Sequence, residues 1–200
     1  MNLLVVDFYD SFTYNLVHYL EGLDCSVTTI LEDQVNLEEL SNYDAIVLSP
    51  GHGLPNEKKN LFNILKICEG KIPVLGICLG IQGIAQYLNL ELENQELVKH
   101  GVSEEIQVLK KNGLFKNVSD SISVGLYHSW KVKNAPQENI TAISENNVIM
   151  ALEFPEKKLF GVQFHPESIM TSDGKQILQN FILMAKSGLQ AGAQPTFSSN

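Results

Sequence analysis

The segment around Cys78 has the residue pattern of a nucleophile held at a strand–helix turn. Gly76-Ile77-Cys78-Leu79-Gly80 follows an apolar run and precedes a helical pattern, so we expect the thiol in a tight turn at a helix N-terminus. The partial positive charge there favours the thiolate, which is the nucleophilic form of cysteine. The backbone N–H of Leu79 is then a natural oxyanion donor. The alternative for Cys78 is a purely structural role, as a small buried cysteine in a glycine-rich turn. We interpret the other two cysteines, Cys25 and Cys68, as structural.

A nucleophilic cysteine needs a base, and His165 is the candidate. It ends an apolar strand pattern, Gly161–Phe164, and the carboxylate of Glu167 follows two residues later. Residues i and i+2 of an extended chain share a face, and Pro166 biases His165 away from helix. Glu167 is therefore predicted to orient the imidazole, as the third member of a Cys-His-acid arrangement does. The alternative is an exposed His-Pro-Glu loop.

A glycine-rich loop follows the strand pattern Ala45–Ser49. Gly51 and Gly53 lie in Ser49-Pro50-Gly51-His52-Gly53-Leu54-Pro55 and allow backbone N–H groups to approach a ligand closely. Together with the Cys78 turn, this loop is predicted to complete an oxyanion hole. Taken alone, it is an ordinary Gly/Pro turn.

Alternating strand and helix patterns must position these residues. Strands are expected at Leu3–Val6, Ser26–Leu31, Ala45–Ser49 and Pro73–Ile77, and helices at 11–22, 57–69, 79–88 and 176–185. Closely spaced strands follow the third helix, around 104–109, 121–125, 140–144, 148–153 and 159–164. The pattern predicts an α/β fold, with an open, mostly parallel sheet covered by helices on both faces and a small antiparallel extension. We expect one domain over residues 1–187 and a disordered tail over 188–200.

Composition limits the classes of partner. The 200 residues carry a formal net charge of −9 and no Lys/Arg cluster, so we predict no nucleic-acid partner. The N-terminal apolar run Leu3–Val6 is too short for a signal peptide or a membrane span, so we predict no membrane association and a cytoplasmic location. Three cysteines without metal-ligand spacing fit a reducing compartment and predict no metal site.

These motifs together resemble the class I (triad) glutamine amidotransferases, with the flavodoxin-like fold of that family. The resemblance runs from about residue 2 to 185 and is greatest to the amidotransferase subunits of anthranilate synthase and aminodeoxychorismate (para-aminobenzoate) synthase. The segments that carry it are Asp7–Leu16, which contains Asp-Ser-Phe-Thr-Tyr-Asn, and Ser49–Pro55, Pro73–Gln82, His100-Gly101, Tyr127-His128-Ser129 and Gly161–Ser168.

The resemblance implies a role for each matching residue. Cys78 would be the nucleophile, His165 the base and Glu167 its partner, with Leu79 and Gly51 as oxyanion donors. The residues implied to line the glutamine site are Gly51, His52, Gly53, Gln82, Ser129 and Trp130. The implied partners are glutamine and a large chorismate-binding synthase subunit, in a heterodimer or a higher hetero-oligomer, and the implied chemistry needs no metal or organic cofactor.

The sequence departs from the family pattern outside the triad. The departures are Phe8, His52, Lys99, Leu126 and Trp130. They concern the shape of the glutamine site and the contacts with a partner rather than the chemistry. Three alternatives stay open: an ammonia donor for another glutamine-dependent synthase, a stand-alone cysteine hydrolase, and a non-catalytic regulatory subunit. The resemblance implies anthranilate, aminodeoxychorismate or both as the product of the complex, and it does not distinguish among them.

Overall fold

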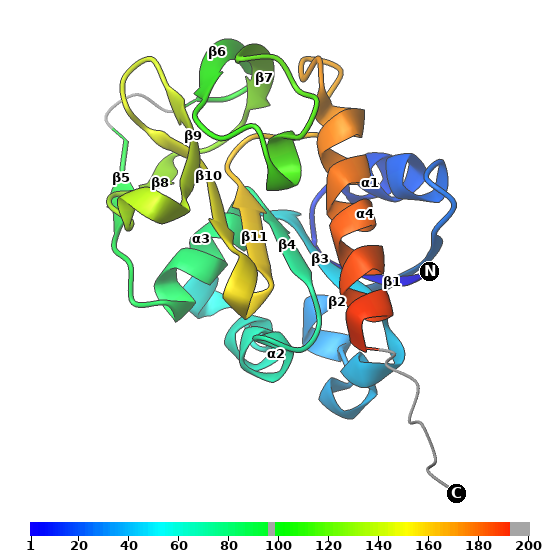
Figure 1. The fold of residues 1–200 in the computed structure, drawn as a ribbon. Helices are drawn as coiled ribbons and strands as arrows, with labels where there is room; N and C mark the ends of the chain where they lie inside the picture. The colour runs from blue at the N-terminus through cyan, green and yellow to red at the C-terminus, as the bar shows by residue number, and fades with distance from the viewer. Residues whose placement is uncertain (96–98, 193–200) are drawn as a thin grey trace, which may run out of the picture.

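The computed structural model describes residues 1–95 and 99–192, which form an α/β fold around one large mixed sheet (Figure 1). The sheet is nine-stranded, with the order β2-β1-β3-β4-β11-β10-β9-β6-β7. The parallel part contains β1 (Asn2–Phe8), β2 (Ser26–Leu31), β3 (Ala45–Gly51), β4 (Val74–Ile77) and β11 (Leu159–Val162). The antiparallel part contains β10 (Ile149–Phe154), β9 (Ile140–Ser144), β6 (Val102–Val108) and β7 (Ser121–Leu126). The predicted mixed, mostly parallel architecture is confirmed.

Helices cover both faces of the parallel part. Side chains of alternate residues in β1 enter opposite cores, Leu3 and Val5 on one face and Leu4 and Val6 on the other. The first core also holds residues of α1 (Thr13–Glu21) and α4 (Gly174–Gly192), and the second holds residues of α2 (Leu61–Cys68) and α3 (Leu79–Tyr87). Strands β1, β3, β4 and β11 are therefore buried on both sides, which explains their mostly apolar sequences, whereas the edge strand β2 is partly exposed.

Several boundaries differ from the sequence prediction. Helix α1 begins at Thr13 because the Asp10 side chain accepts from the Phe12 N–H (2.8 Å) and closes a turn before the helix. Helix α2 begins at Leu61 rather than near Glu57, since Pro55–Glu57 forms a separate 3₁₀ turn, η3. Helix α4 continues to Gly192, so residues 188–192 of the expected tail are helical, and residues 193–200 lie outside the described part of the chain.

A second, two-stranded sheet was not predicted. It pairs β5 (Leu92–Asn94) with β8 (Trp130–Val132) in antiparallel fashion. Both strands are three residues long, too short for an alternating pattern to be recognised. Among the described helices, none has the length and hydrophobicity to cross a bilayer.

Candidate active site

Cys78 lies between β4 and α3 with a backbone conformation that is rare for a residue with a side chain. Its φ is 54° and its ψ is −99°, and it caps the N-terminus of α3. Its N–H donates to the carbonyl of Val162 at 2.8 Å, which ties the turn to β11. A strained backbone conformation persists only when the surrounding structure holds it, and such residues concentrate at functional sites. The sequence prediction of a tight strand–helix turn at Cys78 is confirmed.

The flanking glycines allow the elements around this turn to approach closely. A Cβ atom at Gly76 would lie 2.4 Å from the carbonyl carbon of Gly80 and 2.7 Å from the nitrogen of Ile81. A Cβ atom at Gly80 would lie 2.9 Å from the carbonyl oxygen of Leu48 in β3. Both contacts are with backbone atoms, which cannot rotate away. Glycine at these two positions therefore sets the distance of α3 from the sheet.

His165 and Glu167 form a buried pair beside Cys78. His165 Nδ1 lies 2.7 Å from Glu167 Oε1, and each residue is 2% exposed. The carboxylate can only accept, so Nδ1 carries the proton and Nε2 is the nitrogen left on the Cys78 side. Burial alone would lower the pKa of His165, but its interactions with Cys78 and Glu167 outweigh burial and raise that pKa above its ordinary value. Nε2 makes no hydrogen bond of regular geometry within the described residues. The Cys78 thiol affects the pKa of His165 because it lies close to the imidazole ring.

The His165 ring is also held by aromatic side chains. The centroids of Tyr127 and Phe12 lie 4.9 Å and 5.6 Å from the His165 centroid, both with edge-to-face geometry. Tyr127 also packs edge-to-face on His100 at 5.7 Å. These contacts fix the ring plane while Glu167 fixes its rotation. The imidazole is thus restrained from two directions.

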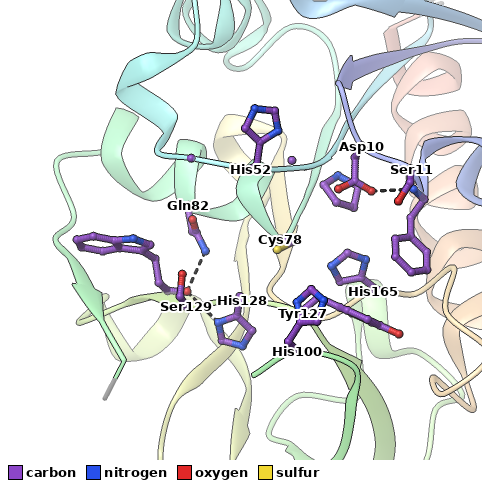
Figure 2. A pocket seen from close by; sticks show the side chains of 15 residues that line it. Asp10, Ser11, His52, Cys78, Gln82, His100, Tyr127, His128, Ser129 and His165 are labelled. Carbon is purple, nitrogen blue, oxygen red and sulfur yellow. Dashed lines mark hydrogen bonds between the residues drawn. The ribbon is translucent and has the colours of Figure 1, made fainter. Parts of the chain in front are cut away.

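Cys78 and His165 open into a cavity of about 520 Å³, which lies within the usual range for small-molecule sites. Figure 2 shows the Cys78 sulfur near its centre, with His165 beside it and Gln82 on the other side. The sequence-predicted residues that line it are Gly51, His52, Gly53, Cys78, Gln82, Ser129, Trp130 and His165. Glu167 lies behind His165, and the Leu79 side chain is buried.

Other lining residues were not predicted as site residues. They are Asp10, Ser11, Phe12, Pro50, His100, Tyr127 and His128. The sequence did contain evidence for them, because Asp10–Phe12, His100 and Tyr127–His128 all fall in segments that carry the family resemblance. Their side chains reach the cavity only because the loop after β1 and the end of β7 meet beside His165, a long-range contact that local patterns do not reveal.

The two expected oxyanion donors come from adjoining segments. Leu79 is the first residue of α3, and N–H groups in the first turn of a helix have no intrahelical acceptor. Gly51 packs against Leu79, since a Cβ atom at Gly51 would lie 2.7 Å from Leu79 Cδ2 and 2.6 Å from Phe8 Cβ. This packing places the glycine-rich loop directly beside the turn that carries Cys78.

On the Gln82 side of the cavity, the carbonyl oxygen of Trp130 contacts two side chains. It accepts from Gln82 Nε2 at 2.9 Å and lies 2.8 Å from His128 Nδ1. Burial lowers the pKa of His128, and the Trp130 hydrogen bond only partly opposes this. His128 is therefore neutral at physiological pH, and its Nδ1 lies 2.8 Å from both the Trp130 carbonyl oxygen and Gln95 Nε2.

The positions that depart from the family pattern differ in exposure. Leu126 is 0% exposed and belongs to the core, so it cannot touch a docked partner. Lys99 makes an ion pair with Glu104 at 2.9 Å. His52 and Trp130 line the cavity. Of these four positions, only His52 and Trp130 line the cavity and can change its shape directly.

Comparisons with known proteins place the chain in a family. The family model for class-I glutamine amidotransferases matches residues 4–185. The chain is 37% identical to the aminodeoxychorismate/anthranilate synthase component 2 of Bacillus subtilis, with 90% of this chain and 95% of that protein covered. It is also 37% identical to the bifunctional protein TrpGD of Thermotoga maritima, over 90% of this chain but only 31% of that longer protein.

Among solved structures, a glutamine amidotransferase from Thermotoga maritima superposes with a TM-score of 0.72 at 20% identity, covering 98% of this chain and 86% of that one. This likeness concerns the fold. The family match and the relatives together show that the chain belongs to the class-I glutamine amidotransferases.

Proposed function

We propose that this chain is the amidotransferase subunit of a chorismate-using synthase, which frees ammonia from glutamine and passes it to a larger partner chain. The observation that carries the proposal is the buried Cys78, His165 and Glu167 arrangement at the edge of a ligand-sized cavity. Membership in the amidotransferase family and similarity to a component 2 protein support it. The names of such relatives favour anthranilate or aminodeoxychorismate as the product.

The proposed reaction begins with transfer of the Cys78 proton to His165 Nε2. The thiolate attacks the side-chain amide carbon of glutamine, and the resulting oxyanion is stabilised by backbone N–H groups of Leu79 and Gly51. His165 then returns the proton to the amide nitrogen as the C–N bond breaks, which releases ammonia and leaves a γ-glutamyl thioester on Cys78. Glu167 stabilises the imidazolium during both steps.

The second half-reaction uses the same groups. His165 removes a proton from water, which attacks the thioester carbon; the C–S bond breaks, glutamate leaves and the thiolate is restored. No oxidant, metal ion or organic cofactor is consumed in this sequence. The described residues also contain no group of three His, Cys, Asp or Glu side chains suited to a metal ion.

The remaining cavity residues are proposed to recognise glutamine. His52, Gly53, Gln82, Ser129 and Trp130 surround the space next to the Cys78 sulfur. Backbone groups of the Gly51–Gly53 loop and of Ser129 can bind the α-amino and α-carboxyl groups of the substrate. Polar groups placed to bind a substrate reject analogues that lack matching groups.

The test is a Cys78→Ser substitution assayed in the complex with the native large subunit. We expect loss of glutamine-dependent synthesis with nearly unchanged synthesis from added ammonia, because amide cleavage and ammonia use lie on different chains. Cys25→Ser is the matched control and should retain both activities, since Cys25 lies away from the cavity. Equal loss of both activities in Cys78→Ser would refute the proposed division of labour.

A further inference from the structure

A chain of buried side-chain amides connects the Trp130 carbonyl with the sulfur of Cys78. Gln82 Nε2 donates to Trp130 O at 2.9 Å and to Gln163 Oε1 at 3.2 Å. Gln163 Nε2 in turn donates to Cys78 Sγ at 3.7 Å. Gln82 is 3% exposed and Gln163 is 0% exposed, so water cannot replace these partners. Figure 2 shows Gln82 directed at the segment of Ser129.

Hydrogen-bond chemistry fixes which group donates and which accepts in each of these contacts. The Trp130 carbonyl can only accept, so the group of Gln82 that faces it must be the NH₂. The same NH₂ faces Gln163 Oε1, which turns the NH₂ of Gln163 toward the sulfur. A donor at this position favours a thiolate over a thiol, because hydrogen bonds to an ionised acceptor are the stronger ones.

The backbone around Gln163 explains why it faces Cys78. Gln163 directly follows β11, and its N–H donates to the carbonyl of Met150 in β10 at 2.8 Å. Val162 and Phe164 enter the core shared with α1 and α4, whereas the Gln163 side chain contacts Gln82 of α3 and Cys78. The absence of a side chain at Gly161 lets α3 approach β11 closely, since a Cβ atom at Gly161 would lie 2.7 Å from Ile81 Cγ1. Gln163 and His165 therefore both lie beside the Cys78 sulfur, on the segment that directly follows β11.

We infer that Gln163 holds the Cys78 thiolate as a second donor beside His165, and that Gln82 positions Gln163 through the Trp130 carbonyl. The inference rests on the proposed role of Cys78 as nucleophile. Gln163 is not among the residues that line the cavity, so its effect is on the sulfur rather than on glutamine. A shift of the segment from His128 to Trp130 would be transmitted to the nucleophile along the same amides.

The test uses the full chain and iodoacetamide, a small neutral alkylating reagent, at neutral pH. Gln163→Met keeps the side-chain length and removes the donor, whereas Gln163→Glu also adds a negative charge next to the sulfur. Alkylation of Cys78 should slow about tenfold in the Met variant and further in the Glu variant, as expected for a thiolate that loses a stabilising donor. The ultraviolet absorbance of the Cys78 thiolate, measured against Cys78→Ser, should fall in the same order.

A purely structural role for Gln163 predicts a different result. Gln107→Glu, which makes the same chemical change at an exposed position, is the matched control and should leave alkylation of Cys78 unchanged. Cys25 and Cys68 are buried, so their labelling would reveal a variant that unfolds. In that case Gln82→Met decides the question, since it leaves Gln163 in place and should still slow alkylation of Cys78. Parent-like alkylation in the folded Gln163 variants, or in Gln82→Met, would overturn the inference.

Steady-state glutamate release by the complex gives an independent readout. In the Gln163 variants kcat for glutamine should fall while KM changes little, because Gln163 lies outside the cavity lining. A rise in KM with unchanged kcat would contradict the assignment. If the parent chain released no glutamate at all, the proposed function would fail, but the alkylation series would still decide the role of Gln163.

Discussion

The backbone of Cys78 combines a positive φ with close contacts on every side of the turn. A non-glycine residue in such a conformation costs about 1–3 kcal/mol, which the surrounding packing must offset. Gly76 and Gly80 provide that packing, since each lies against backbone atoms that cannot move independently. The position of the sulfur is therefore set by the main chain, and the side chains of Gln163 and His165 lie beside it.

Replacing Gly76 with Ala should displace this turn. The added methyl group would lie 2.4 Å from the carbonyl carbon of Gly80, so α3 must move away from β4. We expect a loss of about 1–3 kcal/mol in the free energy of unfolding and slower alkylation of Cys78. Urea unfolding and alkylation rates measure the two effects. Gly188→Ala, where a Cβ atom meets nothing within 4 Å, is the control and should be neutral or slightly stabilising; a neutral Gly76→Ala would refute the packing argument.

Strand β10, the turn η4 (Gly113–Phe115) and helix α4 are joined by polar contacts in the core. Glu153 in β10 accepts from the Leu114 N–H at 3.3 Å, and Asn180 in α4 donates to the carbonyls of Leu114 (2.7 Å) and Lys116 (2.8 Å). Glu153 is 6% exposed. Burial raises the pKa of Glu153 to about 7, although the Leu114 hydrogen bond and nearby Lys110 oppose the shift.

This buried carboxyl group makes stability depend on pH. Because the pKa of Glu153 is higher in the folded state than in the unfolded state, the folded state binds more protons between about pH 4.5 and pH 7. Stability is then lost as the pH rises through this window, by roughly 3 kcal/mol. Glu153→Gln should match the parent at about pH 5 and be more stable at about pH 8. Urea unfolding at both pH values tests this. The raised pKa of His165 affects both proteins equally, so a parent that loses no more stability than the variant would contradict the prediction.

The helices and strands of the parallel part could be predicted from sequence, whereas the walls of the site could not. Apolar runs such as Leu3–Val6 and Pro73–Ile77 are long enough to identify buried strands, and the Cys78 turn and the His165–Glu167 pairing follow from local spacing. Strand β8 is too short for such a pattern, although the family resemblance placed Trp130 in the site. Gln163 was overlooked because its partners, Gln82 and Cys78, are distant in sequence.

The cavity as a whole is assembled from parts that belong to different layers. Its walls come from the loops after β1 and β3, from the N-terminal turn of α3 and from the segment that enters the small β5–β8 sheet. That small sheet is separate from the main one, and the Trp130 carbonyl joins it to α3 through Gln82. Under the proposed function, we expect a docked synthase chain to shift this wall relative to Cys78.

We expect the isolated chain to be a poor glutaminase that is activated when the large subunit binds together with its acceptor substrate. Productive geometry would be reached only in the complex, because docking supplies the free energy to close the site. Glutamate release should be measured for the isolated chain and then with increasing large subunit. An isolated chain that already worked at the rate of the complex would refute this gating. Partner-free hydrolysis of γ-glutamyl peptides would favour a stand-alone hydrolase instead.

The parallel pairing of β4 with β11 also determines when the protein can acquire activity during its synthesis. Val74–Ile77 align with Leu159–Val162, so the strand before Cys78 and the strand before His165 are neighbours in space but distant along the chain. Contacts between distant segments form late, since a long loop must close first. A nascent chain that has left the ribosome only as far as β10 carries the thiol without its imidazole. Under the proposed mechanism, such a partly made chain cannot cleave glutamine.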